Sequence, residues 1–153
     1  MNDGIEISCD PARLDVSLIH RFLRDESHWG KGIALDVVER SIAHSVCLGA
    51  YRSNEQVGFA RAVTDHATFA YLCDVFVVAE WRGRGIASRL VAAMVEHPAL
   101  RSIRRIALRT RDAAPLYAVH GFTPLPDPQL WMERRHNDVV ESASHVAAQE
   151  LLP

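Results

Sequence analysis

A turn rich in glycine and arginine is the first place in this sequence where residue types and spacing point to chemistry. Residues 72–79 form a nearly continuous apolar run, typical of a strand buried on both faces. Residues 86–95 repeat apolar side chains with the period of a helix. Gly83 and Gly85 lie between them, where backbone N–H groups and the helix dipole attract anions. Arg82, Arg84 and Arg89 add positive charge around the turn. The pattern predicts a phosphate site; a plain turn with solvated arginines is the alternative.

Two motifs, in this order along the chain, resemble a known family. Residues 82–87, Arg-x-x-Gly-x-Ala, resemble the (Q/R)-x-x-G-x-(G/A) loop with which the GNAT superfamily of acyl-CoA-dependent N-acyltransferases binds pyrophosphate. Residues 116–122, LYAVHGF, are similar to the L-Y-x-x-x-G-F signature of that superfamily. With the elements described below, the resemblance covers residues 4–135. It implies an α/β (α+β) GNAT-type fold, with a central, mixed, mostly antiparallel and splayed sheet flanked by helices.

The resemblance also implies an acetyl-CoA site formed largely by the main chain. In this family the pantetheine arm runs like an added strand between the fourth and fifth strands, and the glycine turn holds the pyrophosphate. The cofactor-binding residues implied in this way are Phe76, Val77, Val78, Arg82, Gly83, Arg84, Gly85, Ile86, Ala87 and Ser88. No metal is expected, because the histidines show no metal-ligand spacing.

Tyr117 is the candidate acid, because the resemblance places it at the mouth of the same gap. A phenol, whose pKa is ordinarily about 10, can donate a hydrogen bond or a proton to a departing thiolate. The alternative is a tyrosine packed by its ring beneath a short helix. Thr110 stands where the family often has Asn. The side-chain contact that this Asn makes to the cofactor is therefore left open here.

Asp74 is the candidate general base, because it interrupts an apolar, buried-looking strand. A carboxylate in such a place must be paired or functional. It either accepts the proton of the attacking amine through water or hydrogen-bonds a neighbouring loop, and the residues alone leave both open. The reserve candidates are Asp65, His66 and Glu80.

Trp29 is the candidate residue for binding the acceptor. It lies in the loop after the first expected helix, where the family lines its acceptor pocket. An aromatic ring there can bind an amine by a cation–π contact. Trp131 is a second candidate, with packing in the core as its equal alternative.

The elements that position these residues follow from periodicity and turn residues. Strands are expected over 5–9, 46–52, 56–64, 68–78 and 104–110, with final strand material at Phe122 and 130–133. Helices are expected to begin at Asp15, Asp36, Ile86 and Asp112, with each Asp as a capping residue.

Loop lengths predict how the strands pair. Short loops make the second, third and fourth strands an antiparallel meander. The fifth strand follows a helix and should therefore lie parallel to the fourth. The meander, together with the absence of a third glycine, excludes a Rossmann dinucleotide site.

Composition describes an ordinary soluble domain of 153 residues, 48% hydrophobic and 24% charged, with a formal net charge of −2. We expect an acetyltransferase domain over 1–136 and a tail or accessory helix over 137–153. The chain lacks a membrane-length apolar run and a signal-peptide pattern, and its three cysteines favour reduced thiols. The expectation is a cytoplasmic monomer or homodimer that binds neither nucleic acid nor membrane.

The expected function is transfer of the acetyl group of acetyl-CoA to a primary amine, on a small molecule or a peptide, by direct attack in a ternary complex. No cysteine occupies a recognisable nucleophile setting, which disfavours an acetyl-enzyme. A non-catalytic acyl-CoA-binding regulatory module is the alternative, and an O-acyltransferase is a third class.

Overall fold

The computed structural model describes residues 3–136, which form a five-stranded sheet in the order β1-β2-β3-β4-β5. The strands are β1 (Ile5–Ser8), β2 (Val46–Arg52), β3 (Glu55–Thr64), β4 (Ala70–Val77) and β5 (Ile106–Leu108). Each of the first three strands pairs antiparallel with the next, whereas β5 is parallel to β4. The expected meander and the parallel fifth strand are therefore confirmed. The predicted tail over 137–153 lies outside the described residues.

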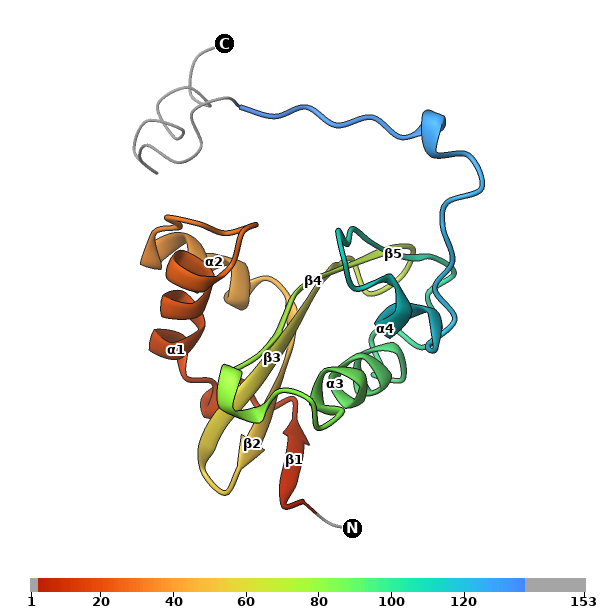
Figure 1. The fold of residues 1–153 in the computed structure, drawn as a ribbon. Coiled ribbons are helices and arrows are strands. Elements are labelled where there is room, and N and C mark those ends of the chain that lie inside the picture. Colours follow the sequence, from red (N-terminus) through yellow and green to blue (C-terminus); the bar gives the residue numbers. More distant parts are fainter. Residues whose placement is uncertain (1–2, 137–153) are drawn as a thin grey trace.

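Helices cover both faces of this sheet (Figure 1). The helices are α1 (Val16–Arg21), α2 (Leu35–Ala43), α3 (Ile86–Val95) and α4 (Ala114–Ala118). A π-helical segment, Phe22–Glu26, continues α1, and short 3₁₀ turns occupy Pro11–Arg13, Ala79–Trp81 and Pro128–Leu130. In Figure 1, α1 and α2 lie on one side of the strands, and α3 and α4 lie on the other. No helix within residues 3–136 is long and apolar enough to cross a membrane.

Two hydrophobic clusters hold the layers together. One lies beneath α3, where Leu90 and Met94 are fully buried against the sheet. The other joins the α1 and α2 side to the sheet through Ile19, Phe59 and Phe76. Burying a side chain of this size stabilises the fold by about 1.5–3 kcal/mol. Each helical layer is thus fixed to the sheet by its own cluster.

The expected helix caps are confirmed at one position and wrong at two. The Asp15 carboxylate accepts the Leu18 N–H at 3.0 Å and caps α1, as expected. Asp36 does not cap α2, because that helix begins earlier, after Ala34, and Asp36 lies in its first turn. Asp112 does not cap α4, because Pro115 sets the start of that helix after Ala113.

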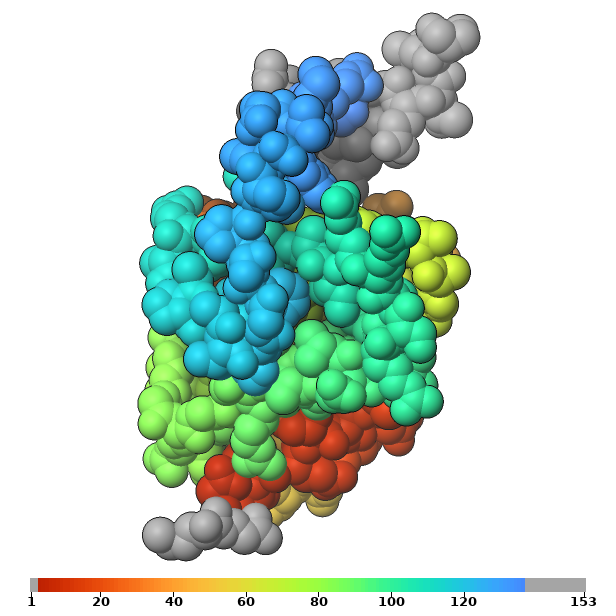
Figure 2. All heavy atoms as spheres, turned by 90° about the vertical axis from the view of Figure 1, so that its right-hand side faces the viewer, coloured from red at the N-terminus to blue at the C-terminus, as the bar shows by residue number. Residues whose placement is uncertain are grey.

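The expected final strand is also wrong. Residues 128–130 form a 3₁₀ turn, and residues 131–136 have no regular secondary structure. Proline has no N–H group to donate to a β ladder, and Pro124, Pro126 and Pro128 precede this stretch at every second position. In Figure 2 the blue segment that follows them projects beyond the upper end of the molecule.

Candidate active site

A β-bulge in β4 shapes the centre of the site. The register between β3 and β4 shifts between the pairs Phe59–Phe76 and Arg61–Cys73, so β4 carries an additional residue there. Asp74 lies at the bulge with a φ of 53°, in the left-handed region that side chains other than glycine rarely adopt. The bulge bends β4 and re-aims its side chains.

Beyond the bulge, β4 and β5 separate. Their pairing covers only Ala70–Leu72 of β4 and all of β5. Within residues 3–136, the rest of β4 has no strand on that side, and Figure 1 shows β5 diverging from the long strands. Backbone groups on the open edge of β4 are therefore available to an extended ligand that adds to the sheet as a strand.

Of the residues predicted to bind the cofactor, Phe76 and Val77 lie in the part of β4 beyond its pairing with β5, and Val78 follows directly. The ring of Phe76 is stacked on Phe22, with centroids 3.9 Å apart, so this side chain belongs to the core. The Val77 carbonyl accepts a hydrogen bond from the Arg82 guanidinium at 2.9 Å. The Val78 N–H donates to Val57 of β3. Arg82 therefore ties the end of β4 to the glycine turn that follows.

The glycine turn leads directly into the N-terminus of α3. Gly83 and Gly85 have φ values of 75° and 76°, which explains why glycine occupies both positions. A Cβ atom on either would meet no atom of residues 3–136 within 4 Å, so the space in front of the turn is open. Gly85 is the N-cap, and no side chain of the described part caps the helix. The first N–H groups of α3 consequently lack an intrahelical partner, and they border this open space.

The arginines near this turn have different partners. Arg84 stacks over the Trp81 ring at 4.6 Å. Arg89 donates to Asp3 and to the Ile5 carbonyl at β1, so its charge is paired away from the turn. The sequence suggested that Arg89 adds to the charge around the turn, and the structure corrects this view.

A contact that the sequence did not predict joins α3 to the residues after α4. The Ser88 hydroxyl and His120 Nε2 are 2.7 Å apart. Ser88 belongs to the first turn of α3, and His120 lies within the L-Y-x-x-x-G-F motif. The second motif therefore contacts the first turn of α3, at the residue that directly follows the first motif.

Tyr117 lies on α4, half-buried, with its ring edge-on to Phe122 at a centroid distance of 5.9 Å. Burial raises the pKa of Tyr117, and Cys73 on β4 adds to the effect. The phenol therefore keeps its proton near neutral pH.

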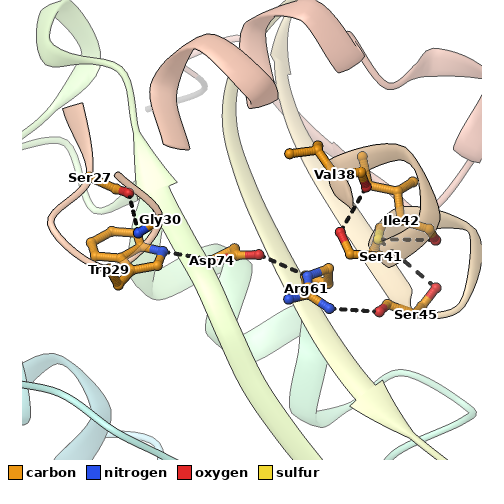
Figure 3. A network of polar contacts seen from close by, with 10 residues as sticks. Ser27, Trp29, Gly30, Val38, Ser41, Ile42, Ser45, Arg61 and Asp74 are labelled. Atoms are coloured by element: carbon orange, nitrogen blue, oxygen red, sulfur yellow. Dashed lines mark hydrogen bonds and ion pairs between the residues drawn. The ribbon is translucent and has the colours of Figure 1, made fainter. Parts of the chain in front are cut away.

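The Asp74 carboxylate is the centre of a polar network that spans two strands and a loop (Figure 3). Its Oδ1 accepts the Trp29 indole N–H at 2.9 Å, and its Oδ2 accepts Arg61 Nε at 2.8 Å. Arg61 also donates to the Ser45 hydroxyl at 3.0 Å. The Trp29 side chain, 48% exposed, is thereby held beside β4. Both carboxylate oxygens are occupied, as expected for the loop-anchoring alternative.

The reserve bases and the second tryptophan occupy other environments. Asp65 accepts hydrogen bonds from the hydroxyl and N–H of Thr68 and from other N–H groups of its turn, and these hold its pKa well below its usual range. His66 is exposed in that turn, and Glu80 is exposed after β4. Trp131 packs near Phe69 and Arg105, and no ring contact within residues 3–136 joins it to Trp29.

Arg61 and Ser45 were missed at the level of sequence. A signal for Arg61 existed, because an arginine inside the apolar β3 run needs a partner, and Asp74 interrupts the next strand in the same way. Nothing in the local pattern marked Ser45.

Comparison with known proteins decides the family. The sequence model described as the acetyltransferase (GNAT) domain matches residues 43–124. The candidate acetyltransferase FG08082 of Gibberella zeae is 31% identical over 133 residues, which cover 72% of this chain and 74% of that protein. This chain belongs to the GNAT acetyltransferase family.

Solved structures of GNAT proteins have the same fold. A candidate acetyltransferase of Xanthomonas campestris is 46% identical, with a TM-score of 0.86 over 90% of this chain and 97% of that one. A predicted acetyltransferase of Clostridium acetobutylicum, solved with acetyl-CoA, is 20% identical, with a TM-score of 0.63 over 86% of this chain and 96% of that one. At that identity the likeness concerns the fold alone. The expected GNAT family and fold class are confirmed.

Proposed function

We propose that this GNAT protein transfers the acetyl group of acetyl-CoA to the nitrogen of a primary amine, by direct attack in a ternary complex. The observation that carries the proposal is the continuous path from the open edge of β4 to the uncapped N-terminus of α3. An extended pantetheine arm matches the first part, and a pyrophosphate matches the second. Phe76, Val77 and Val78 would contact the arm through their main chain.

Residues 82–88 would hold the pyrophosphate of acetyl-CoA. The N–H groups at the start of α3 supply donors, and the helix dipole favours the negative charge. Gly83 and Gly85 leave room for the phosphates to approach the backbone. The Ser88 hydroxyl, now bonded to His120, lies in the same turn and can turn toward a phosphate oxygen.

In the transfer step, the neutral amine attacks the thioester carbonyl. A C–N bond forms, the C–S bond breaks, and the leaving thiolate takes a proton from the Tyr117 hydroxyl. The amine nitrogen loses its extra proton to water, and solvent restores the proton of Tyr117. Burial supports this role, because it keeps the phenol protonated until charge develops on sulfur.

Direct transfer also fits the protonation state of the Cys47 and Cys73 thiols. Burial raises the pKa of Cys47 and of Cys73 to about 12, so both remain protonated. A protonated thiol is a poor nucleophile. Cys73, next to the bulge, is therefore unsuited to form an acetyl-enzyme.

Asp74 and Trp29 would form the acceptor side. The exposed indole is a platform for an amine-bearing group, and its hydrogen bond to Asp74 fixes its orientation. We assign Asp74 the role of positioning Trp29, because its two oxygens already hold Trp29 and Arg61. The competing assignment is that Asp74 acts as the general base.

The test is acetyl-CoA turnover against small amines, peptides with free N-termini and lysine peptides, with acetylated product measured by mass spectrometry. We expect acetylation of at least one amine class, and a strongly reduced rate in a folded Tyr117→Phe variant. Saturable acetyl-CoA binding without any product would contradict the proposal and favour a non-catalytic module. A product acetylated on oxygen would instead indicate an O-acyltransferase.

A further inference from the structure

One polar contact joins the first turn of α3 to the residues that follow α4. Ser88 Oγ and His120 Nε2 lie 2.7 Å apart, and both residues are half-buried. Among residues 3–136, the His120 ring has no other hydrogen-bond partner. A serine hydroxyl can donate or accept, so this contact by itself allows either tautomer of a neutral imidazole. A further partner of the hydroxyl would decide between them.

The main chain holds His120 in place beside α3. The N–H groups of His120 and Phe122 both donate to the Tyr117 carbonyl, at 2.9 and 3.3 Å. Gly121, between them, has a φ of 89°, which suits a glycine that closes a turn after a helix. The imidazole therefore reaches Ser88 from a backbone that is itself tied to α4.

The Ser88 hydroxyl lies where a negatively charged oxygen is favoured. Ser88 is the third residue of α3, and the first N–H groups of this helix have no side-chain cap within the described part. A helix serine often bonds back to a carbonyl of its own helix, but Ser88 instead contacts His120. When Nε2 carries a proton and donates it to Ser88 Oγ, the hydroxyl proton is free to bond an anion in the same turn.

We propose that His120 is a positioning residue for acetyl-CoA: it donates to Ser88 Oγ and thereby presents the Ser88 proton to a phosphate oxygen. This role rests on the proposed function, because it requires the pyrophosphate at the first turn of α3. His120 acts through Ser88 and does not itself contact the ligand. Bound phosphate selects the ring form with a proton on Nε2, since the other neutral form would occupy the hydroxyl proton.

The first test measures the affinity of two ligands by calorimetry. One is acetyl-CoA, and the other is adenosine 3′-phosphate 5′-diphosphate, which carries the phosphates without the pantetheine arm. His120→Ala should weaken both by a similar factor, about 3- to 10-fold, as expected for one hydrogen bond. His120→Gln, whose amide N–H can replace Nε2–H, should retain most of the affinity, whereas His120→Phe, which keeps only a ring, should not. His44→Ala, at an exposed histidine after α2, is the control and should change neither affinity.

Three outcomes of this test would overturn the role of His120. One is unchanged affinity of His120→Ala for both ligands. The second is a loss confined to acetyl-CoA, because His120 would then act on the acyl end rather than on phosphate. The third is full affinity in His120→Phe, which would leave His120 as a packing residue. A wild-type protein that does not bind acetyl-CoA would contradict the proposed function itself, and this role with it.

The second test asks whether His120 acts through Ser88. In a Ser88→Ala background, His120→Ala should cause little further loss of affinity, because the hydroxyl that it positions is already absent. Additive losses would overturn the proposal. Nitrogen NMR of the ring gives an independent readout: with saturating acetyl-CoA, His120 Nε2 should carry a proton, and a proton on Nδ1 alone would also overturn it. Circular dichroism checks that each variant is folded.

Discussion

Burial keeps three titratable side chains protonated: Tyr117 on α4, Cys47 on β2 and Cys73 on β4. It raises the pKa of Tyr117 above its ordinary value, and those of Cys47 and Cys73 to about 12. A protonated phenol is a proton donor, whereas a protonated thiol is a weak nucleophile. The same physical cause therefore favours Tyr117 as acid and disfavours both cysteines as acetyl carriers.

We expect Tyr117→Phe to lower kcat by about 10²–10⁴-fold, the usual contribution of a general acid. Phenylalanine keeps the ring against Phe122, so acetyl-CoA affinity, measured by calorimetry, should change little. The stability cost should be no more than that of one hydrogen bond, about 1 kcal/mol. A variant with wild-type kcat, where chemistry limits the rate, would leave Tyr117 as a packing residue.

The pH dependence of kcat provides a separate check on Tyr117. The acid form is the active one, so activity should fall as pH rises through the pKa of the phenol. Burial raises that pKa above the ordinary value of a tyrosine, about 10, so the fall should lie above that pH. The decline should be absent from the residual activity of Tyr117→Phe, and its persistence there would assign it to another group.

At the scale of elements, the bulge in β4 connects the two halves of the candidate site. It turns Asp74 toward the loop that carries Trp29, and beyond it β4 separates from β5. The last residues of β4 then enter the glycine turn and α3. One strand irregularity therefore positions the proposed acceptor side and opens the proposed cofactor path.

The coupling of Asp74 to Trp29 can be tested by a double-mutant cycle. Trp29→Ala should raise the KM for the acceptor severalfold and leave the KM for acetyl-CoA nearly unchanged, while Trp131→Ala, the control, should alter neither. If Asp74 acts through Trp29, Asp74→Asn should have little additional effect on the acceptor KM in the Trp29→Ala background. A large fall in kcat on Asp74→Asn in both backgrounds would instead identify Asp74 as the base.

The N-terminus of α3 predicts a charge effect at Gly85. Gly85→Asp places a carboxylate in the proposed phosphate site, and acetyl-CoA affinity in calorimetry should fall by at least tenfold. Gly85→Asn is the matched control, because Asn has the same shape and tolerates a positive φ as Asp does. It should lose clearly less affinity. Equal losses in the two variants would mean that space, rather than charge, matters at this position.

At the scale of the whole molecule, each helical layer supplies one side of the candidate site. The loop with Trp29 follows α1 and its π-helical continuation, whereas the glycine turn leads into α3 and Tyr117 lies on α4. The sheet between them carries the gap, and separate clusters pack each layer against it. A ligand in the gap would therefore contact elements that are otherwise joined mainly through the sheet.

Acetyl-CoA should accordingly raise the melting temperature of the protein. A ligand at 100 times its Kd that binds only the native state stabilises it by about 2.7 kcal/mol. The midpoint should rise with acetyl-CoA concentration in a calorimetric scan, and CoA without its acetyl group should act similarly, because most contacts involve pyrophosphate and pantetheine. An unchanged midpoint at saturating concentration would contradict the cofactor assignment.

The sequence by itself determined the features that depend on local period and turn chemistry. These include the antiparallel meander, the parallel return to β5, the glycine turn before α3 and the GNAT family. Alternating or helical apolar patterns and positive-φ glycines are properties of neighbouring residues, so they can be read without coordinates. The Asp15 cap belongs to this group as well.

Only the tertiary structure decided which side chains meet across elements. Asp74 lies 45 residues from Trp29 and 13 from Arg61, and its bulge turns it toward both. The strand expected at 130–133 failed for a related reason: a strand exists only where a partner accepts its hydrogen bonds, and the prolines lead this segment away from β5. Local patterns encode conformation, whereas pairing depends on how the chain brings distant segments together.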